Sequence, residues 1–249
     1  MKSVLASFTL FTRLPAWRIC DIPASAYSQT VVYWPLTGWL TGGCMALCIS
    51  LLSSIIPLQV TVIFAIILRL LLTGALHEDG LADFCDGFGG GKDKESVLRI
   101  MKDSSIGSYG VIGLISHFFL LWVVLSSLSP IIAALAIFSA DPIAKATASQ
   151  LTNILPYARP EGAKNKISYS RMSGLQLLVN VCSGLLPLTL LIIVYPFYSI
   201  AIVFPVAGLL FLASLMKKRI GGYTGDCCGA TFLICESLFL IGILFIYYI

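Results

Sequence analysis

Long apolar stretches alternate with short polar segments along the whole chain of 249 residues. An α-helix needs about 20 apolar residues to cross a bilayer, and it satisfies its backbone hydrogen bonds within itself. The strict alternation of a membrane β-barrel strand is not found. The pattern predicts an all-α polytopic membrane protein with about seven transmembrane helices, at residues 31–56, 59–76, 109–128, 131–152, 174–194, 197–215 and 227–248.

The N-terminal residues follow a different pattern. An apolar run begins at Val4 but is interrupted by Arg13, Pro15 and Arg18, which does not suit a cleavable signal peptide. We therefore expect residues 1–29 to be retained as an interfacial segment. Because apolar runs are spread along the whole chain, we expect residues 1–249 to form a single integral-membrane domain.

The basic residues predict an orientation. Lys and Arg gather in the N-terminal segment and in residues 77–108, 153–173 and 216–226, whereas the turns near residues 57, 129 and 196 carry no charge. With seven spans, all four basic segments lie on one side of the membrane. The positive-inside rule makes that side cytoplasmic.

Composition narrows the function further. Only 11% of the residues are charged and the net charge is +4, which fits basic loops at a membrane better than binding of nucleic acid. Eight cysteines are present, but neither a CxxC pair nor a Cys/His metal spacing occurs. We expect these cysteines to act as small apolar side chains.

One segment is rich in acidic residues. Seven of the twelve Asp and Glu residues lie between Glu78 and Asp103. Asp79, Asp83 and Asp86 are spaced so that their carboxylates share one face of a helix, where they would repel one another. Divalent cations relieve such repulsion, and carboxylate oxygens suit Mg²⁺, Mn²⁺ or Ca²⁺. The alternative is a solvated charged loop.

The acidic residues are followed by candidate phosphate ligands. Gly87 and Gly89 to Gly91 form either a plain turn or a close backbone contact with phosphate, although no P-loop sequence is present. Arg99, Lys102 and Asp103 place cations beside carboxylates, which fits a site for metal and phosphate. His77 is a candidate base, a phosphate contact or a helix-end residue.

Charged residues inside predicted spans are costly and are therefore candidates for function. Glu236 lies within the last span, which Asp226 opens, and should face the interior of the bundle, as a functional or a packing residue. Asp141 and Lys145 have the spacing of a structural ion pair. Arg69 could reach the membrane surface or line the cavity.

Several sequence blocks carry a resemblance to a known family. They are FTRLP at residues 11–15, GALHEDGLADFCDG at 74–87, IMKDSSIGSYG at 100–110 and GGYTGDCCGA at 221–230. In this order, over nearly the full length, they resemble the cobalamin synthase family (adenosylcobinamide-GDP ribazoletransferases). The resemblance implies a Mg²⁺-dependent enzyme of a bacterial or archaeal cell (inner) membrane. It would join adenosylcobinamide-GDP to α-ribazole or α-ribazole 5′-phosphate and release GMP.

The resemblance also implies roles for residues. Asp79, Asp83, Asp86 and Asp226 would form the metal and diphosphate site, and Asp83 or Asp86, with His77 as a further candidate, would serve in proton transfer. The predicted substrate contacts are Asp103, Arg99, Lys102, Gly87, Gly222 and Glu236. Two pieces, Asp83-x-x-Asp86-Gly87 and Gly222-x-x-x-Asp226, also resemble part of the CDP-alcohol phosphotransferase signature. Ala230 stands where that signature has a last Asp, and Asp141-Pro142 stands where the synthases are expected to have Ser-Arg.

Other functions and partners stay open at this point. A lipid headgroup phosphotransferase would use the same metal chemistry, and a divalent-cation transporter would use the acidic residues as an ion path. The basic segment from Arg159 to Arg171 could hold substrate phosphates or anionic lipid headgroups. Membrane lipids and a second copy of the chain are further possible partners.

Overall fold

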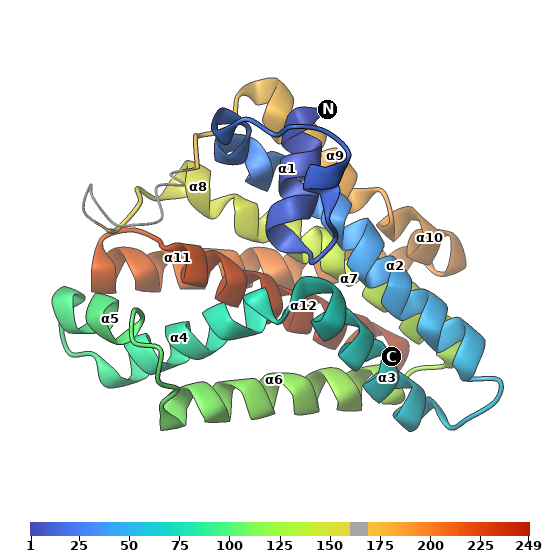
Figure 1. The fold of residues 1–249 in the computed structure, drawn as a ribbon. Helices are drawn as coiled ribbons and strands as arrows, with labels where there is room; N and C mark the ends of the chain where they lie inside the picture. The colour runs from blue at the N-terminus through green and yellow to red at the C-terminus, as the bar shows by residue number, and fades with distance from the viewer. Residues whose placement is uncertain (160–168) are drawn as a thin grey trace.

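A computed structural model describes residues 1–159 and 169–249. Within these residues the chain is helical and contains no strand; a single parallel bridge joins Tyr157 and Tyr223. In chain order (Figure 1) the helices are α1 (Lys2–Phe11), η1 (Ala16–Arg18), η2 (Ala24–Tyr33), α2 (Trp34–Leu52), α3 (Leu58–Thr73), α4 (Leu76–Gly90), α5 (Lys94–Ile100), α6 (Ser108–Ser126), α7 (Pro130–Ser149), α8 (Leu151–Ile154), α9 (Gly174–Leu185), α10 (Leu188–Val194), η3 (Pro196–Ile202), α11 (Val203–Ile220) and α12 (Gly225–Tyr247).

The prediction of an all-α polytopic membrane protein is confirmed. Among the described residues, five helical segments are long and apolar enough to cross a membrane: Ala24–Leu52, Ser108–Ser126, Pro130–Ile154, Pro196–Ile220 and Gly225–Tyr247. The number rises to seven if the bent pairs α3/α4 and α9/α10 each count as one span. Large apolar side chains such as Phe64, Leu71 and Phe119 are exposed on the outer helices, where lipid would cover them.

The bend between α3 and α4 was not predicted. The two helices meet at 92°, and Gly74 and Ala75 between them have φ values of +69° and +58°. The left-handed conformation costs a residue with a side chain about 1–2 kcal/mol, so packing around Ala75 must hold it there. The FTRLP segment contributes, because the Arg13 N–H donates to the Leu72 carbonyl at 2.7 Å. The acidic segment is therefore a helix turned sharply away from α3.

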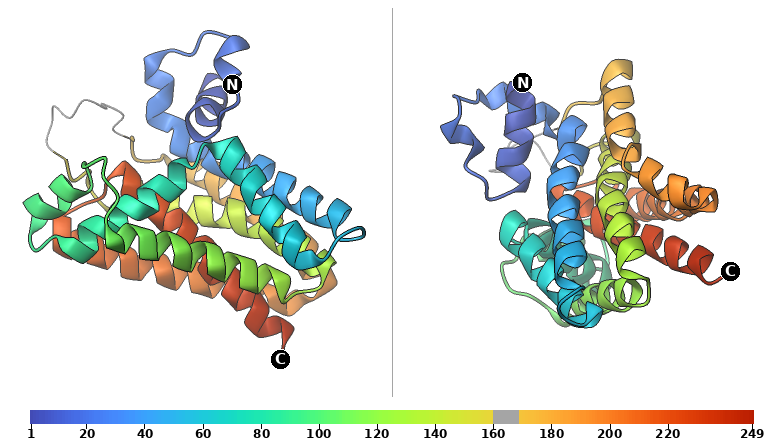
Figure 2. Two further views of the ribbon diagram at one scale, coloured as in Figure 1. Left: turned by 60° about the horizontal axis from the view of Figure 1, so that its bottom comes forward. Right: turned by 90° about the vertical axis from the view of Figure 1, so that its right-hand side faces the viewer.

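Helix α12 forms the centre of the bundle. It packs against α4, α6, α7 and α11, so the last helix of the chain meets elements from its middle (Figures 1 and 2). Helices α2 and α7 cross closely because α2 has glycines there: a Cβ atom on Gly38 would lie 2.8 Å from the Cα atom of Pro142. The N-terminal helix α1 stands to one side of the bundle and packs against η2 (Figure 2).

The basic and the uncharged connections between helices lie at opposite ends of the bundle. Figure 1 places α5, the α11–α12 connection and the end of α8 at one end of the bundle, and the turns near residues 57 and 129 at the other. These are the predicted basic and uncharged segments, respectively. Residues 160–168 of the predicted basic segment lie outside the described residues.

Candidate active site

The crossing of α4 and α12 brings the predicted acidic residues together. It is close because each helix has a glycine at the contact: a Cβ atom on Gly80 would lie 3.1 Å from the Cα atom of Asp226, and one on Gly229 would lie 3.2 Å from the His77 carbonyl oxygen. Asp226 therefore stands beside the α4 turn that carries Asp79 and Asp83. The charges of Asp79 and Asp226 both act on the Asp83 carboxylate.

The carboxylates at this crossing are available to a ligand. Asp79 is exposed and Asp83 is half-buried, and within the described part of the chain neither side chain has a hydrogen-bond or ion-pair partner. In the same part, no three His, Cys, Asp or Glu side chains are grouped closely enough to hold one metal ion. Mg²⁺ usually needs only one or two carboxylates, with substrate phosphates and water completing its coordination. One or two of the three carboxylates Asp79, Asp83 and Asp226 would supply oxygen donors suited to such an ion.

Asp86 has a different environment from the other predicted metal ligands. Its two carboxylate oxygens accept hydrogen bonds from the N–H groups of Gly107 (2.7 Å) and Gly110 (2.9 Å), at the start of α6. A carboxylate at a helix N-terminus satisfies free N–H groups and complements the helix dipole. A side chain on either glycine would collide with Asp86. This contact accounts for both glycines of the GSYG sequence and gives Asp86 a structural role.

Asp226 is held by a short connection between distant segments. The Tyr223 N–H donates to the Pro156 carbonyl at 3.0 Å, and the Ala158 N–H donates to the Tyr223 carbonyl at 2.8 Å. Gly222 is required here, since a Cβ atom would overlap the Pro156 carbonyl oxygen. The predicted substrate contact Gly222 thus positions residues 157–159 beside α12.

This connection positions the cationic side chain of Arg159 at the site. Arg159 donates from Nη2 to the Asp226 carboxylate at 2.9 Å, and both side chains are about one quarter exposed, at 23% and 27%. Arg159 therefore lies at a solvent-accessible edge of the α4–α12 crossing. It belongs to the basic segment in which a phosphate contact was predicted.

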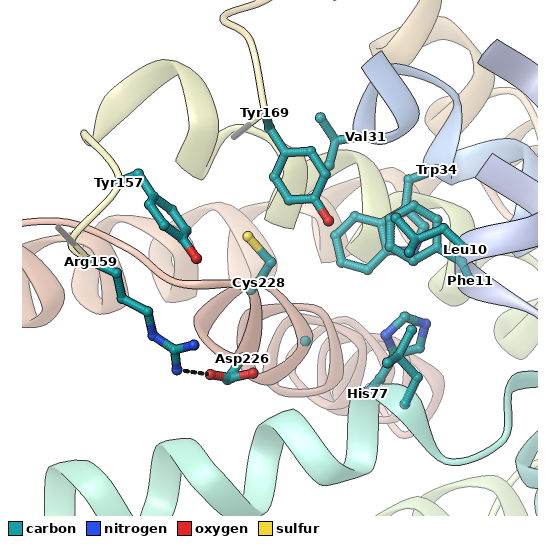
Figure 3. A pocket seen from close by; sticks show the side chains of 13 residues that line it. Leu10, Phe11, Val31, Trp34, His77, Tyr157, Arg159, Tyr169, Asp226 and Cys228 are labelled. Carbon is teal, nitrogen blue, oxygen red and sulfur yellow. Dashed lines mark hydrogen bonds and ion pairs between the residues drawn. The ribbon is translucent and has the colours of Figure 1, made fainter. Parts of the chain in front are cut away.

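A cavity of about 410 Å³ opens beside this ion pair (Figure 3). Burial raises the pKa of the Tyr157 and Tyr169 hydroxyls, so both stay protonated and can donate hydrogen bonds. The cavity thus has a polar mouth next to the acidic crossing. Its lining consists of Leu10, Phe11, Val31, Trp34, Leu76, His77, Tyr157, Arg159, Tyr169, Gly225, Asp226, Cys228 and Gly229.

His77 lies among aromatic rings. Its ring centroid is 5.4 Å from that of Trp34, 4.9 Å from that of Phe232 and 5.9 Å from that of Phe11. It is only 3% exposed, and its Nε2 atom has no hydrogen-bond partner among the described residues. The structure therefore places His77 in the wall of the cavity.

Comparison with known proteins identifies the family. The sequence matches the cobalamin-5-phosphate synthase family over residues 3–244. The chain belongs to the cobalamin-5-phosphate synthase family. It is 36% identical over 251 residues to the adenosylcobinamide-GDP ribazoletransferase of Leptospira interrogans serogroup Icterohaemorrhagiae serovar copenhageni, covering 96% of this chain and 93% of that protein. It is 34% identical over 237 residues to the enzyme of the same name from Shewanella sp. (strain W3-18-1), covering 93% and 89%.

The match extends over nearly the whole chain and confirms the family resemblance of the sequence blocks. No solved structure matches this synthase. The protein is a transferase of cobalamin biosynthesis, and its fold carries several apolar helices.

Other predicted substrate contacts of the synthase lie away from the cavity. Arg99, Lys102 and Asp103 are exposed on α5 and the turn after it, at the far end of α4 (Figure 1). Asp103 accepts a hydrogen bond from the Ser105 N–H at 2.9 Å, which lowers its pKa. Gly87 packs against α5, where a Cβ atom would collide with Met101. Their predicted contacts with substrate stay predictions.

The charged residues inside the spans form buried pairs. Nη1 of Arg69 donates to both oxygens of Glu236, at 2.6 and 2.7 Å, and Glu78 lies 3.9 Å from the same guanidinium. Glu236 is fully buried and is not part of the cavity wall. Arg69 is 1% exposed, so it neither reaches the membrane surface nor lines the cavity.

The predicted ion pair of Asp141 and Lys145 is confirmed, with 2.6 Å between its charged atoms. The Thr41 hydroxyl of α2 donates to Asp141 at 2.6 Å and accepts from Lys145 at 2.8 Å. This network joins α2 to α7 and leaves neither charge unpaired in an apolar interior. It explains how the Asp-Pro pair in the fourth span is accommodated.

The cavity wall contains residues that the sequence pattern did not single out. Phe11 lies within the FTRLP block, but nothing in its spacing indicated a cavity. Trp34 and Tyr157 look like ordinary interfacial aromatics next to apolar runs. Tyr169 gains its place from contacts across the chain, and an aromatic residue on its own gives no signal of such a contact.

Proposed function

We propose that this protein is a membrane-embedded adenosylcobinamide-GDP ribazoletransferase that joins adenosylcobinamide-GDP to α-ribazole or α-ribazole 5′-phosphate and releases GMP. The observation that carries the proposal is the meeting of two helices beside a cavity of nucleoside size. Asp79 and Asp83 of α4, which have no partner among the described residues, lie there next to Asp226 of α12 and its ion-pair partner Arg159. The names of the relatives support the substrates.

We propose Mg²⁺ as the cofactor, held by Asp83 together with Asp79 or Asp226. The ion would supply positive charge to the diphosphate as the bond to GMP breaks. Asp86 is left out of this set because each of its oxygens already accepts a hydrogen bond from the start of α6. Arg159 would contact a phosphate oxygen, and the exposure of its guanidinium at the edge of the site supports this role.

The chain's own residues would act on the acceptor hydroxyl. In the proposed step the 3′-oxygen of ribazole bonds to the cobinamide-side phosphorus, the bond from that phosphorus to the bridging oxygen breaks, and GMP leaves with that oxygen. Asp83 accepts the hydroxyl proton through the carboxylate oxygen that does not hold the ion, because it is half-buried and its side chain has no hydrogen-bond or ion-pair partner among the described residues. The remaining task of the protein is to hold the two substrates in line.

Purified protein in vesicles tests this proposal. With adenosylcobinamide-GDP, α-ribazole and Mg²⁺, we expect GMP and the joined product in equal amounts, and neither after chelation of the metal. If the basic end of the bundle faces the cytoplasm, impermeant nucleotides added outside should react with inside-out vesicles and not with right-side-out vesicles. Activity with a CDP-alcohol and a lipid hydroxyl, or flux of Mg²⁺ without substrate, would instead support the two alternative functions and contradict the proposal.

A further inference from the structure

The turn that follows α1 holds large apolar side chains outward. Within residues 13–20, here called the N-terminal turn, Trp17 is 53% and Ile19 is 74% exposed, and Arg18 lies exposed between them. The turn is nevertheless ordered, because the Arg18 N–H donates to the Pro15 carbonyl at 3.0 Å and η1 packs against α1. Adjacent large apolar side chains that a fold holds outward mark a contact site for a membrane or another protein.

The N-terminal turn lies at the level where membrane spans end. The Arg13 N–H donates to the Leu72 carbonyl in the last turn of α3, and the first candidate span, Ala24–Leu52, begins shortly after the N-terminal turn. Arg13 is also fixed against the bend that directs α4, since a Cβ atom on Gly74 would collide with its side chain. Both views of Figure 2 show the dark-blue N-terminal segment to one side of the bundle. A segment in this place meets the lipid headgroups that surround the bundle.

The chemistry of the N-terminal turn suits an anionic membrane surface. Tryptophan is enriched at membrane–water interfaces, because its ring is apolar and its N–H group can donate to a headgroup. Arg18 stands between the two apolar side chains, and a guanidinium can donate two hydrogen bonds to one phosphate. Residues 1–29 contain three basic residues and one acidic residue, Asp21, so their net charge is attracted to anionic lipid.

We infer that the N-terminal turn is an anchor for anionic phospholipid, with Trp17 and Ile19 among the upper acyl chains and the Arg18 guanidinium on the lipid phosphate. Such a lipid supplies both halves of the contact, an apolar chain for the two apolar side chains and a phosphate for the cation. A second copy of the chain fits less well, because its own basic turn would bring like charge to the same place. The inference does not depend on the proposed function, since it concerns the membrane surface and not the cavity.

Fluorescence quenching by brominated lipids tests the anchor. The full chain is placed in nanodiscs, and the Trp17 signal is the difference between the wild type and Trp17→Phe, because the chain contains four tryptophans. Bromine on the acyl chains near the headgroup should quench this signal more strongly than bromine near the chain ends, and aqueous iodide should quench it little. Quenching by iodide and not by brominated lipid would place the turn in water and overturn the inference. Protection from both quenchers would show that protein covers the turn, which would overturn it too.

A second measurement tests the class of lipid. In mixed nanodiscs of phosphatidylglycerol and phosphatidylcholine, bromine is carried first by one lipid and then by the other. We expect the Trp17 signal to report a preference for phosphatidylglycerol of about fivefold in relative affinity, as one guanidinium near an anionic surface would give. Arg18→Gln should remove most of this preference, whereas Lys218→Gln, at an exposed position near the end of α11, should keep it. Equal quenching by the two lipids in the wild type, or an unchanged preference in Arg18→Gln, would overturn the inference.

Discussion

The carboxylate of Asp86 shows how one residue in a regular pattern can have a separate role. Asp79, Asp83 and Asp86 share a face of α4 by spacing, yet only Asp86 points its two oxygens at the N–H groups that open α6. It is 8% exposed, whereas Asp79 is exposed. Spacing on one helix cannot reveal this difference, because the partner lies on another helix.

We therefore predict that Asp86→Asn destabilises the protein. The amide keeps one acceptor oxygen and turns a donor toward the second N–H group, so the free energy of unfolding should fall by about 2 kcal/mol. Thermal unfolding in detergent measures the change. Asp79→Asn is the matched control and should leave the unfolding temperature unaltered; an equal loss in both variants would contradict the helix-capping role.

At the scale of elements, three helices meet at one buried charge cluster. Arg69 comes from α3, Glu78 from α4 and Glu236 from α12, so the cluster spans the 92° bend. Nε and Nη2 of Arg69 have no hydrogen-bond partner in the described structure, which leaves Glu236 as its main contact. The pair ties α3 to α12 and so helps to fix the direction in which α4 leaves the bend.

Replacement of Arg69 alone should therefore destabilise the bundle more than replacement of both Arg69 and Glu236. Arg69→Met leaves the Glu236 carboxylate buried without a counter-charge, at a cost of roughly 3–5 kcal/mol of stability. Adding Glu236→Gln should restore part of this loss, and a double-mutant cycle from unfolding in detergent gives the coupling. Strictly additive effects of the two substitutions would show that the pair does not stabilise the bundle.

At the scale of the whole molecule, the pattern of apolar residues predicted where the helices lie. It did not predict where they break. The predicted span at 109–128 corresponds to α6 (Ser108–Ser126), because long apolar runs have few alternatives in a bilayer. The predicted single span at 174–194 is two helices bent by 43°. The sharper bend after α3 depends on a left-handed Ala75, and alanine carries no signal for that conformation.

Only part of the candidate site was predicted, because contacts between distant segments leave no local sequence pattern. The acidic face of α4 and the glycine-rich start of α12 are local patterns that can be read directly. The contact of Gly80 with Asp226, and the bridge that brings Arg159 to Asp226, join segments far apart in the sequence. Their pairing depends on how the bundle packs, and no spacing along one segment encodes it.

We propose that the α4–α12 carboxylates act on the diphosphate through a metal ion, and Asp83→Asn tests this role most directly. In the GMP-release assay with adenosylcobinamide-GDP and α-ribazole, we expect this variant to lose about a hundredfold or more in rate at every Mg²⁺ concentration, with an unchanged unfolding temperature. Asp93→Asn, an exposed helix-capping position on α5, should keep the wild-type rate. Wild-type GMP release by Asp83→Asn would contradict the account.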